Sequence, residues 1–456
     1  MEENSKEYLG KEDVKKLFWK LSLPAIIAQL INMLYNIVDR IYIGHIPEVG
    51  SLALTGVGVC MPIIILVSAF AAFAATGGAP RASIFLGKGD LDSSEKILGG
   101  SLTMQVVISI VLTIVLLIFG EGFLLSFGAS ENTIDYALAY LRIYALGTIF
   151  VEVTLSMNAF ITAQGDAKTA MYTVLIGAII NIILDPIFIF ALDMGVRGAA
   201  LATITSQAIS CIWVLKYLTG EKAFIKLKKE NLLVSFKEFV FPSILLGLAT
   251  FIMQASESIL GVVFNASLLK YGGDIAVGAM TILTSVMMFA LLPLQGMGQG
   301  AQPITSYNFG AGKADRVKES FKVLVKNSFS YTAIIWLLIM IFPQVFARIF
   351  TPDQDLVDFT SWALRIYGAG IIAMGIQIGC QMTFVAIGSA KVSILVAVFR
   401  KFIMLIPLIY ILPNFFADKV FAVYLAEPVA DFTAVAFTVI LFRIHFKKAM
   451  EKIEGK

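Results

Sequence analysis

Twelve long apolar runs constrain the fold of this chain. They are separated by short charged or turn-rich breaks, and each is long enough to cross the hydrocarbon core of a bilayer as a helix. Of the 456 residues, 58% are apolar, which leaves no room for a soluble catalytic domain. The sequence therefore predicts an all-α integral membrane protein with twelve transmembrane helices, and not an enzyme. We place the runs near residues 17–44, 51–80, 97–119, 133–160, 169–192, 196–218, 237–265, 276–306, 321–346, 358–387, 392–415 and 420–444.

An internal repeat divides these spans into two groups of six. Residues 141–144 (LRIY) recur as residues 364–367, at an offset of 223. Because six is an even number, the two six-helix lobes share one membrane orientation, and we expect a pseudo-two-fold axis along the membrane normal. The same offset relates residues 165–168 to 388–391, and Pro80, Ser83, Gly87 and Gly89 to Pro303, Ser306, Gly310 and Gly312.

The first span of each lobe aligns with a different offset. Pro24 matches Pro242 and Asp39 matches Glu257, both 218 residues apart. The predicted organisation is a cytoplasmic N-terminal tail (1–16), an N-lobe (17–218), a cytoplasmic linker (219–236), a C-lobe (237–444) and a cytoplasmic C-terminal tail (445–456).

Lysines and arginines are distributed unevenly along the chain. With the N-terminus assigned to the cytoplasm, 27 of the 35 fall in inner segments and 7 in outer ones, with Arg400 and Lys401 counted in the inner segment 391–401. Positive charge accumulates on the cytoplasmic side, so we expect a multi-pass cell-membrane protein with both termini inside. The basic linker fits a segment lying on the anionic inner surface, and equally a plain solvated connection.

Polar residues follow one stripe of the first span. Gln29, Asn32, Asn36 and Asp39 are spaced three or four residues apart, so they share one side of a helix. Lipid cannot satisfy such a stripe, so it must face other helices or a water-filled cavity. Pro24 lies in the same span and predicts a bend or hinge.

Acidic residues inside the N-lobe spans are the leading candidates for function. Asp39 and Asp185 both lie toward the outer ends of their spans, so a shared pocket is geometrically allowed, and Asn181 lies one helical turn before Asp185. Two close carboxylates in a low dielectric bind a proton or share a cation, which suits H+ or Na+ coupling. The alternative is that each caps a broken helix or bonds an arginine such as Arg40. Beyond Na+ at this pair, no metal is expected.

Further candidates are less specific. Glu152 is equally consistent with a structural hydrogen bond and with a function. In the C-lobe, Gln254 and Glu257 share a helix side, and Glu257 is a candidate for a second cation site or a contact for drug. Glu427 and Asp431, four residues apart, are either acids facing a cavity or an interfacial pair near water.

Several of these segments together resemble the multidrug and toxic-compound extrusion (MATE) family. They are the two-fold repeat, the Leu-Pro opening of span 1 with Asp39, residues 181–186 (NIILDP) and residues 198–203 (GAALAT). The resemblance covers nearly the whole chain and is closest to the DinF-type and MepA-like branch. It implies a MOP-superfamily fold whose lobes rock between outward- and inward-facing states, and export of cationic drugs driven by H+ or Na+.

The resemblance also implies site residues. In the DinF-type branch the cation site lies in the N-lobe, and protonation is linked to bending at the proline of the first span, here Pro24. The NorM-like branch instead uses acids on spans 7 and 10; Glu257 matches the first, but span 10 has no acid. On this sequence the N-lobe site corresponds to Asp39, Asn158, Asn181, Asp185 and Thr203.

The sequence is therefore interpreted as a secondary antiporter that exports amphipathic organic cations. No GxxxxGK[ST] motif occurs, so an ion gradient is the expected energy source, with H+ or Na+ as the coupling ion and no other cofactor. The expected partners are cationic amphiphiles and membrane lipid, with no nucleic acid, and the chain is expected to be a monomer. The alternative is a flippase for lipid-linked glycans or lipids, which usually needs a strongly cationic cavity, whereas the intramembrane charges here read as acidic.

Overall fold

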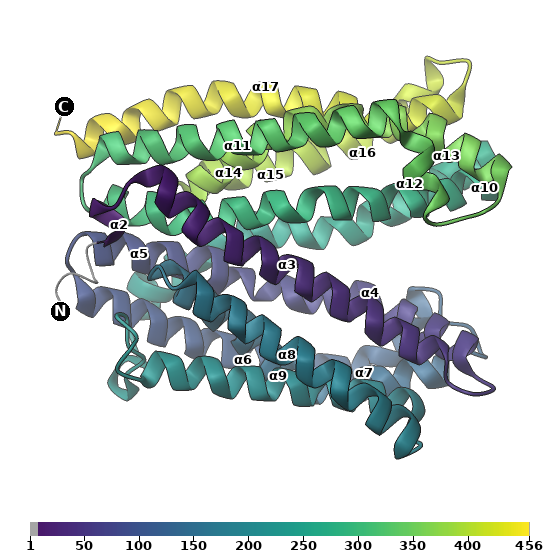
Figure 1. The fold of residues 1–456 in the computed structure, drawn as a ribbon, viewed down its shortest axis with the longest axis horizontal. Helices are drawn as coiled ribbons and strands as arrows, with labels where there is room; N and C mark the ends of the chain where they lie inside the picture. Colours follow the sequence, from purple (N-terminus) through teal and green to yellow (C-terminus); the bar gives the residue numbers. More distant parts are fainter. Residues whose placement is uncertain (1–7, 456) are drawn as a thin grey trace.

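The computed structural model describes residues 8–455, and it places them in two helical bundles that lie side by side (Figure 1). Twelve helices in this part of the chain are long and apolar enough to span a membrane, which confirms the predicted number. Each bundle contains six of them, so the predicted two-lobe, all-α architecture is also confirmed. We number the spans 1 to 12 in chain order.

The N-lobe contains spans 1 to 6. They are α3 (Val14–Gly44); α4 (Gly50–Phe70), η1 (Phe73–Gly78) and α5 (Ala79–Gly87), which together form span 2; α6 (Leu91–Ser126); α7 (Ile134–Ala163); α8 (Ala167–Pro186) with η2 (Ile187–Ala191); and α9 (Gly195–Thr219). A short helix, α2 (Tyr8–Lys11), precedes α3.

The C-lobe contains spans 7 to 12. Spans 7 and 8 are η4 (Phe236–Val240) and α10 (Phe241–Gly310), which turns at Gly273, where φ is 64°. The others are α11 (Ala314–Ile341); α13 (Gln354–Tyr367), η5 (Gly368–Gly370) and α14 (Ile371–Ala386), which form span 10; α15 (Ala390–Val398), η6 (Phe399–Leu405), α16 (Ile406–Ile411) and η7 (Leu412–Asn414), which form span 11; and α17 (Lys419–Ile453). A short helix, α12 (Pro343–Arg348), follows α11.

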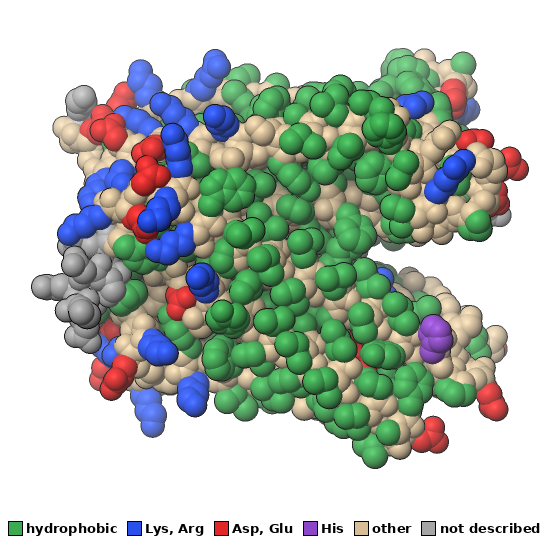
Figure 2. Space-filling view, viewed as in Figure 1, with side chains coloured by type: hydrophobic (Ala, Val, Ile, Leu, Met, Phe, Trp, Pro, Cys, Tyr) green, Lys and Arg blue, Asp and Glu red, His purple; other side chains and the backbone are tan. Residues whose placement is uncertain are grey.

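The two ends of the molecule differ in charge and in shape. Lys and Arg side chains gather at the end where both chain termini lie, and there the lobes touch (Figures 1 and 2). At the opposite end the lobes separate and a cleft opens between them (Figure 2). We call these the closed end and the open end.

Reciprocal glycine contacts join the lobes in the closed half. Gly87 packs on the backbone of Tyr307, and Gly310 packs on the backbone of Ile84. Since 84 and 307, and also 87 and 310, are related by the repeat offset of 223, the two contacts exchange under a two-fold axis. Such an isologous pattern is what a pseudo-symmetric interface requires.

Two more pairs of contacts follow the same rule. Gly77 packs on Ser243 while Gly300 packs on Ser22, and Gly247 packs on Ala72 and Phe73 while Gly296 packs on Ile26. A Cβ at Gly296 would lie only 2.7 Å from the Cα of Ile26. Glycine therefore lets the two backbones approach more closely than any side chain would allow.

These contacts correct the predicted register between spans 1 and 7. Ser22 takes the place of Ser243 and Ile26 that of Gly247, so the offset here is 221, not 218. Under this offset Glu257 corresponds to Asn36, and Asp39 has no acidic counterpart. Matching the two prolines misled the sequence comparison, because a proline can occupy different turns of two related helices.

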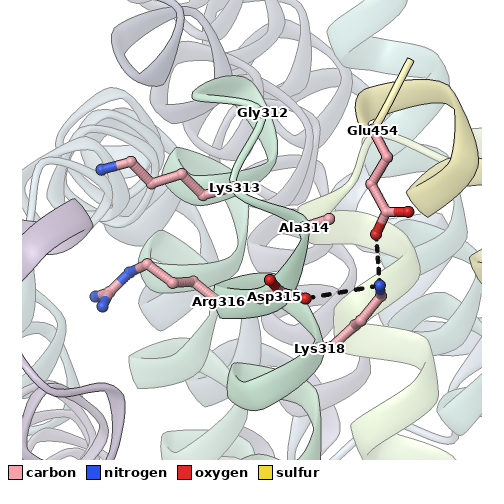
Figure 3. A pocket seen from close by; sticks show the side chains of 7 residues that line it. All are labelled: Gly312, Lys313, Ala314, Asp315, Arg316, Lys318 and Glu454. Carbon is pink, nitrogen blue, oxygen red and sulfur yellow. Dashed lines mark hydrogen bonds and ion pairs between the residues drawn. The ribbon is translucent and has the colours of Figure 1, made fainter. Parts of the chain in front are cut away.

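The short helix α2 joins both lobes at the closed end. The Tyr8 hydroxyl donates to the carbonyl of Gly165 in the N-lobe at 2.6 Å. From the C-lobe, Asn308 and Arg316 donate to the carbonyl of Leu9, and Lys313 donates to that of Gly10. Figure 3 shows Lys313 and Arg316 extending away from Lys318, which binds Asp315 and Glu454 instead.

The predicted linker and tails are more ordered than expected. The linker is fixed to the N-lobe, because Gln164 accepts the backbone N–H groups of Phe224 and Ile225, and Glu95 pairs with Lys228. Helix α17 continues to Ile453, through most of the predicted tail 445–456. Of the predicted tail 1–16, residues 1–7 lie outside the described residues, and residues 8–11 form α2.

The glycine contacts predict opposite effects for two Gly→Ala substitutions in α10. Gly296→Ala should lower the melting temperature of the detergent-solubilised protein, since overpacking a tight contact costs about 1–3 kcal/mol. Gly261→Ala, with no atom within 4 Å of the added Cβ, should keep or raise it, because alanine favours helix by up to about 1 kcal/mol. Equal shifts in the two variants would contradict the proposed close contact.

Candidate functional site

Two carboxylates in the N-lobe come together as the sequence predicted. Asp39 lies near the open end of α3, Asp185 lies in the last turn of α8, and α3 packs along α8. Both residues are buried, and they are close enough for each charge to act on the other. Pro186 ends α8 directly after Asp185, and the wider helical turn η2 begins at the next residue, Ile187.

The oxygens around this pair lack partners. Asn181 donates to Asp185 Oδ1 at 3.2 Å. Asp185 Oδ2, Asp39 Oδ1 and Asn181 Oδ1 are buried and accept no hydrogen bond in the part of the chain that the structure describes. Among the described residues Arg40 makes no direct ion pair with Asp39, although its charge acts on that carboxylate from a distance. Three unsatisfied oxygens on two neighbouring spans fit a proton or a hard cation.

A tyrosine that the sequence reasoning missed completes the surroundings of the pair. The Tyr140 phenol from α7 lies against Thr203 and near the Asp39 carboxylate. Thr203 donates its hydroxyl to the carbonyl of Ala199 at 3.0 Å, so its oxygen can still accept or coordinate. Tyr140 follows the ordinary apolar pattern of its span, and nothing in its spacing separates it from a packing residue.

Asn158 does not belong with this cluster. Its amide donates to the carbonyl of Ala170 at 3.1 Å, near the closed end of α8. Eleven residues separate Ala170 from Asn181 on that helix, a rise of about 16 Å. The structure thus brings together Asp39, Asp185, Asn181 and Thr203, and places Asn158 a third of a bilayer away.

Glu152 lies in the packed interior of the N-lobe. Its side chain is fully buried and accepts a hydrogen bond of 2.7 Å from Gln105 in α6. This hydrogen bond joins two helices, as the structural role among the two considered requires. The other carboxyl oxygen, Oε1, is buried and accepts no hydrogen bond among the described residues, which is what the functional role requires.

The polar stripe of span 1 is divided between the two lobes, because Gln29 faces the C-lobe and Asp39 lies with Asp185 of α8 in the N-lobe. Gln29 donates to Gln299 in the C-lobe at 3.2 Å, which continues the contact made by Ser22 and Ile26. Asn32 and Asn36 are half-buried further toward the open end, and Asn36 bonds the carbonyl of Asn32. Pro24 is buried within a helix that continues through it, so it removes one backbone donor without ending the span.

The C-lobe contains a cluster of charged residues that the sequence analysis treats as separate features. Arg400 donates to Asp431 at 2.7 Å and to Glu427 at 3.0 Å; both carboxylates are buried, and the Arg400 side chain is 11% exposed. Lys401 donates to Glu257 Oε1 at 2.7 Å. Spans 7, 11 and 12 thus meet through two bases and three acids.

This cluster corrects two predictions. Arg400 and Lys401 lie in η6, in the middle of span 11, and not in the inner segment 391–401 to which we had assigned them. Glu427 and Asp431 are buried ion-pair partners and not an interfacial pair near water. Both bases already fell inside the predicted run 392–415, which was the one signal that could have revealed them.

Comparisons with known proteins place this architecture in a family. A family model described as MatE matches residues 24–187 and again residues 249–411, more than half of the chain. The multidrug export protein MepA of Staphylococcus haemolyticus is 26% identical over 432 residues, with 94% of each chain covered. MepA of Staphylococcus aureus is 24% identical over 461 residues, with 100% of each chain covered.

Solved structures show the same fold. A crystal structure of MATE in the bent conformation superposes with a TM-score of 0.92 at 23% identity, with 99% of each chain covered. An outward-facing multidrug resistance MATE family transporter of the MOP superfamily gives a TM-score of 0.90 at 23% identity, with 97% of this chain and 98% of the other covered.

Arg400→Gln should destabilise the protein strongly, by about 3–5 kcal/mol, because it leaves two buried carboxylates without their shared cation. Thermal unfolding in detergent measures this effect. The triple variant with Glu427→Gln and Asp431→Asn should recover most of the loss. Lys447→Gln, which breaks an exposed pair with Glu451, is the matched control and should change little. A triple variant as unstable as Arg400→Gln alone would contradict the pairing.

Proposed function

This chain belongs to the MatE family, and on that premise we propose that it exports amphipathic organic cations across the cell membrane in exchange for H+ or Na+. Relatives named as multidrug export proteins support this class of substrate. The observation that carries the proposal is the pair Asp39 and Asp185, two buried neighbouring carboxylates without a cationic partner among the described residues.

The pair supplies a coupling site. Two carboxylates in a low dielectric repel each other unless a proton or a metal cation lies between them. An organic cation and the coupling ion therefore compete for one pair of carboxylates. Such competition couples the two ligands when each binds one conformational state more tightly than the other. Asn181 and Thr203 add neutral oxygens, a donor set that suits H+ and Na+ alike.

Helix α3 connects this site to the contact between the lobes. It carries Asp39 near its open end and Ser22 and Ile26 in its closed half, where it packs on α10. A change in the packing of α3 at Asp39 therefore acts on the same rigid element that holds the lobes together. Pro24 lies between these two contact residues, and the span has one backbone donor fewer there to resist bending.

The charge distribution supports an outward-open state. Even with Arg400 and Lys401 moved into the membrane, most Lys and Arg residues lie at the closed end (Figure 2). The positive-inside rule assigns that end, with both termini, to the cytoplasm. The cleft then opens to the exterior, and the inward-facing state requires the glycine contacts to separate.

The C-lobe charges weigh against the flippase alternative. A pyrophosphate group needs unpaired cationic side chains in the cavity. The two bases of span 11 are both committed to carboxylates, Arg400 to Glu427 and Asp431 and Lys401 to Glu257. Cationic amphiphiles, and not a lipid-linked glycan, are therefore the substrates that we propose for this chain.

Asp39→Asn and Asp185→Asn should each reduce gradient-driven ethidium efflux from proteoliposomes by about tenfold or more, within the usual range of coupling free energies. Each variant removes a charge that the coupling ion must neutralise. Imposing a pH gradient and a sodium gradient separately identifies the ion. Asp193→Asn, an exposed acid in the loop between spans 5 and 6, is the matched control and should pump normally.

Efflux that is normal in both variants but lost in Glu257→Gln would move the coupling site to the C-lobe and refute the assignment. Wild-type protein that moves ethidium under neither gradient would refute the proposed antiport itself.

The proposed orientation predicts which positions react with a membrane-impermeant maleimide in intact cells. A cysteine at Glu131→Cys, exposed at the open end, should be labelled from outside, and one at Lys222→Cys, exposed in the linker, should react only after lysis. The native cysteines Cys60, Cys211 and Cys380 are buried and should give a low background. The reverse pattern would invert the topology.

A further inference from the structure

Lys401 lies where a lysine is costly. Its side chain is 5% exposed in the middle of span 11. Burial of an ammonium group in a membrane protein requires a partner, and such residues are commonly functional. It belongs to η6, a widened helical turn of the kind often found at functional sites. Its ion-pair partner is Glu257.

The two partners of this pair have different surroundings. The Glu257 side chain is 58% exposed, whereas Lys401 lies behind it. The bond uses Glu257 Oε1 alone, so the carboxylate retains the capacity to accept a second cationic group. Arg400, the adjacent base, is directed to Glu427 and Asp431 and is not bonded to Glu257.

Helix geometry places Glu257 at the wall of the cleft. Gly247 touches the N-lobe, and Phe251, one turn further, stacks on Phe73 with ring centroids 5.1 Å apart. Gln254 lies seven residues after Gly247, two turns along the same side, and is exposed because the lobes have separated there. Glu257 is three residues beyond Gln254 and borders this side.

We propose that Lys401 is a built-in counter-ion of the cleft wall, which competes with the cationic group of the substrate for Glu257. The inference rests on the proposed export of organic cations and adds a residue that sets substrate affinity. In the outward-open state Lys401 occupies the carboxylate. Its presence weakens the hold of the wall on a cationic substrate and so favours release to the exterior.

The pair also explains why the two lobes do not offer equivalent cation sites. Glu257 already has an internal cation, whereas Asp39 and Asp185 have none. The C-lobe acid is therefore available to a substrate that can displace an ammonium group, and the N-lobe pair is available to the coupling ion.

Equilibrium binding of ethidium to purified protein in detergent tests the proposal. Lys401→Met should tighten binding about fivefold or more, the size expected when one opposing charge beside a partly exposed carboxylate is removed. Glu257→Gln should weaken binding. In the double variant the effect of Lys401→Met should vanish, because no carboxylate remains for the two cations to contest.

Two control variants accompany this measurement. Lys270→Met removes a lysine from the open end of span 7, where it lies over the Tyr271 ring, and should leave affinity unchanged. Lys401→Arg keeps the charge and should bind like the wild type. The double variant buries no lone charge, so it also reports on the site if Lys401→Met proves too unstable to purify.

Unchanged affinity in Lys401→Met, or equal tightening with and without Glu257, would overturn the proposal. Either result is distinct from failure of the proposed function, in which the wild-type protein itself would neither bind nor export ethidium.

Discussion

Close backbone contact between the lobes is the constraint on which the rest of the structure depends. Glycines meet the backbone of the opposite lobe in reciprocal pairs, Gly87 with Gly310, Gly77 with Gly300 and Gly247 with Gly296. Without a hydrophobic effect between helices in lipid, such contacts must rely on dispersion and shape. Each contact has a symmetric partner on the other lobe. Any movement that separates the two lobes therefore breaks both contacts of a pair together. This makes the interface suited to two states and not to gradual opening.

The two lobes differ in the ion-pair partners of their buried carboxylates. In the N-lobe Asp39 and Asp185 lie near each other, and each has a buried oxygen that accepts no hydrogen bond among the described residues. In the C-lobe each of the three acids has an ion-pair partner, Arg400 for Glu427 and Asp431 and Lys401 for Glu257. Gene duplication preserved the helical scaffold, as the offset of 223 shows, while the charges diverged. The two lobes consequently differ in how their buried acids are paired.

The parts of this arrangement that could be predicted from sequence are those set by local pattern. The spans follow from apolar length, and the nearness of Asp39 and Asp185 follows from depth along their helices. The ion pairs of Arg400 and Lys401 could not be predicted, because their acidic partners come from spans 12 and 7. A count of charges within each segment contains no information on contacts between spans. The family resemblance places Asn158 in the cation site, but its depth separates it from that site by several helical turns. The repeat offset between spans 1 and 7 could be determined only from the glycine contacts between the lobes.

The short helix α2 has a consequence for how the chain is assembled. It is among the first segments to be synthesised, yet its carbonyl groups are bound by Asn308, Lys313 and Arg316, some 300 residues later. Its docking site does not exist until span 9 has begun to form, and it also needs Gly165 from the N-lobe. A segment made about 300 residues before its partners thus docks only after they have been made. Its docked state reports that both halves have been made, inserted and brought together.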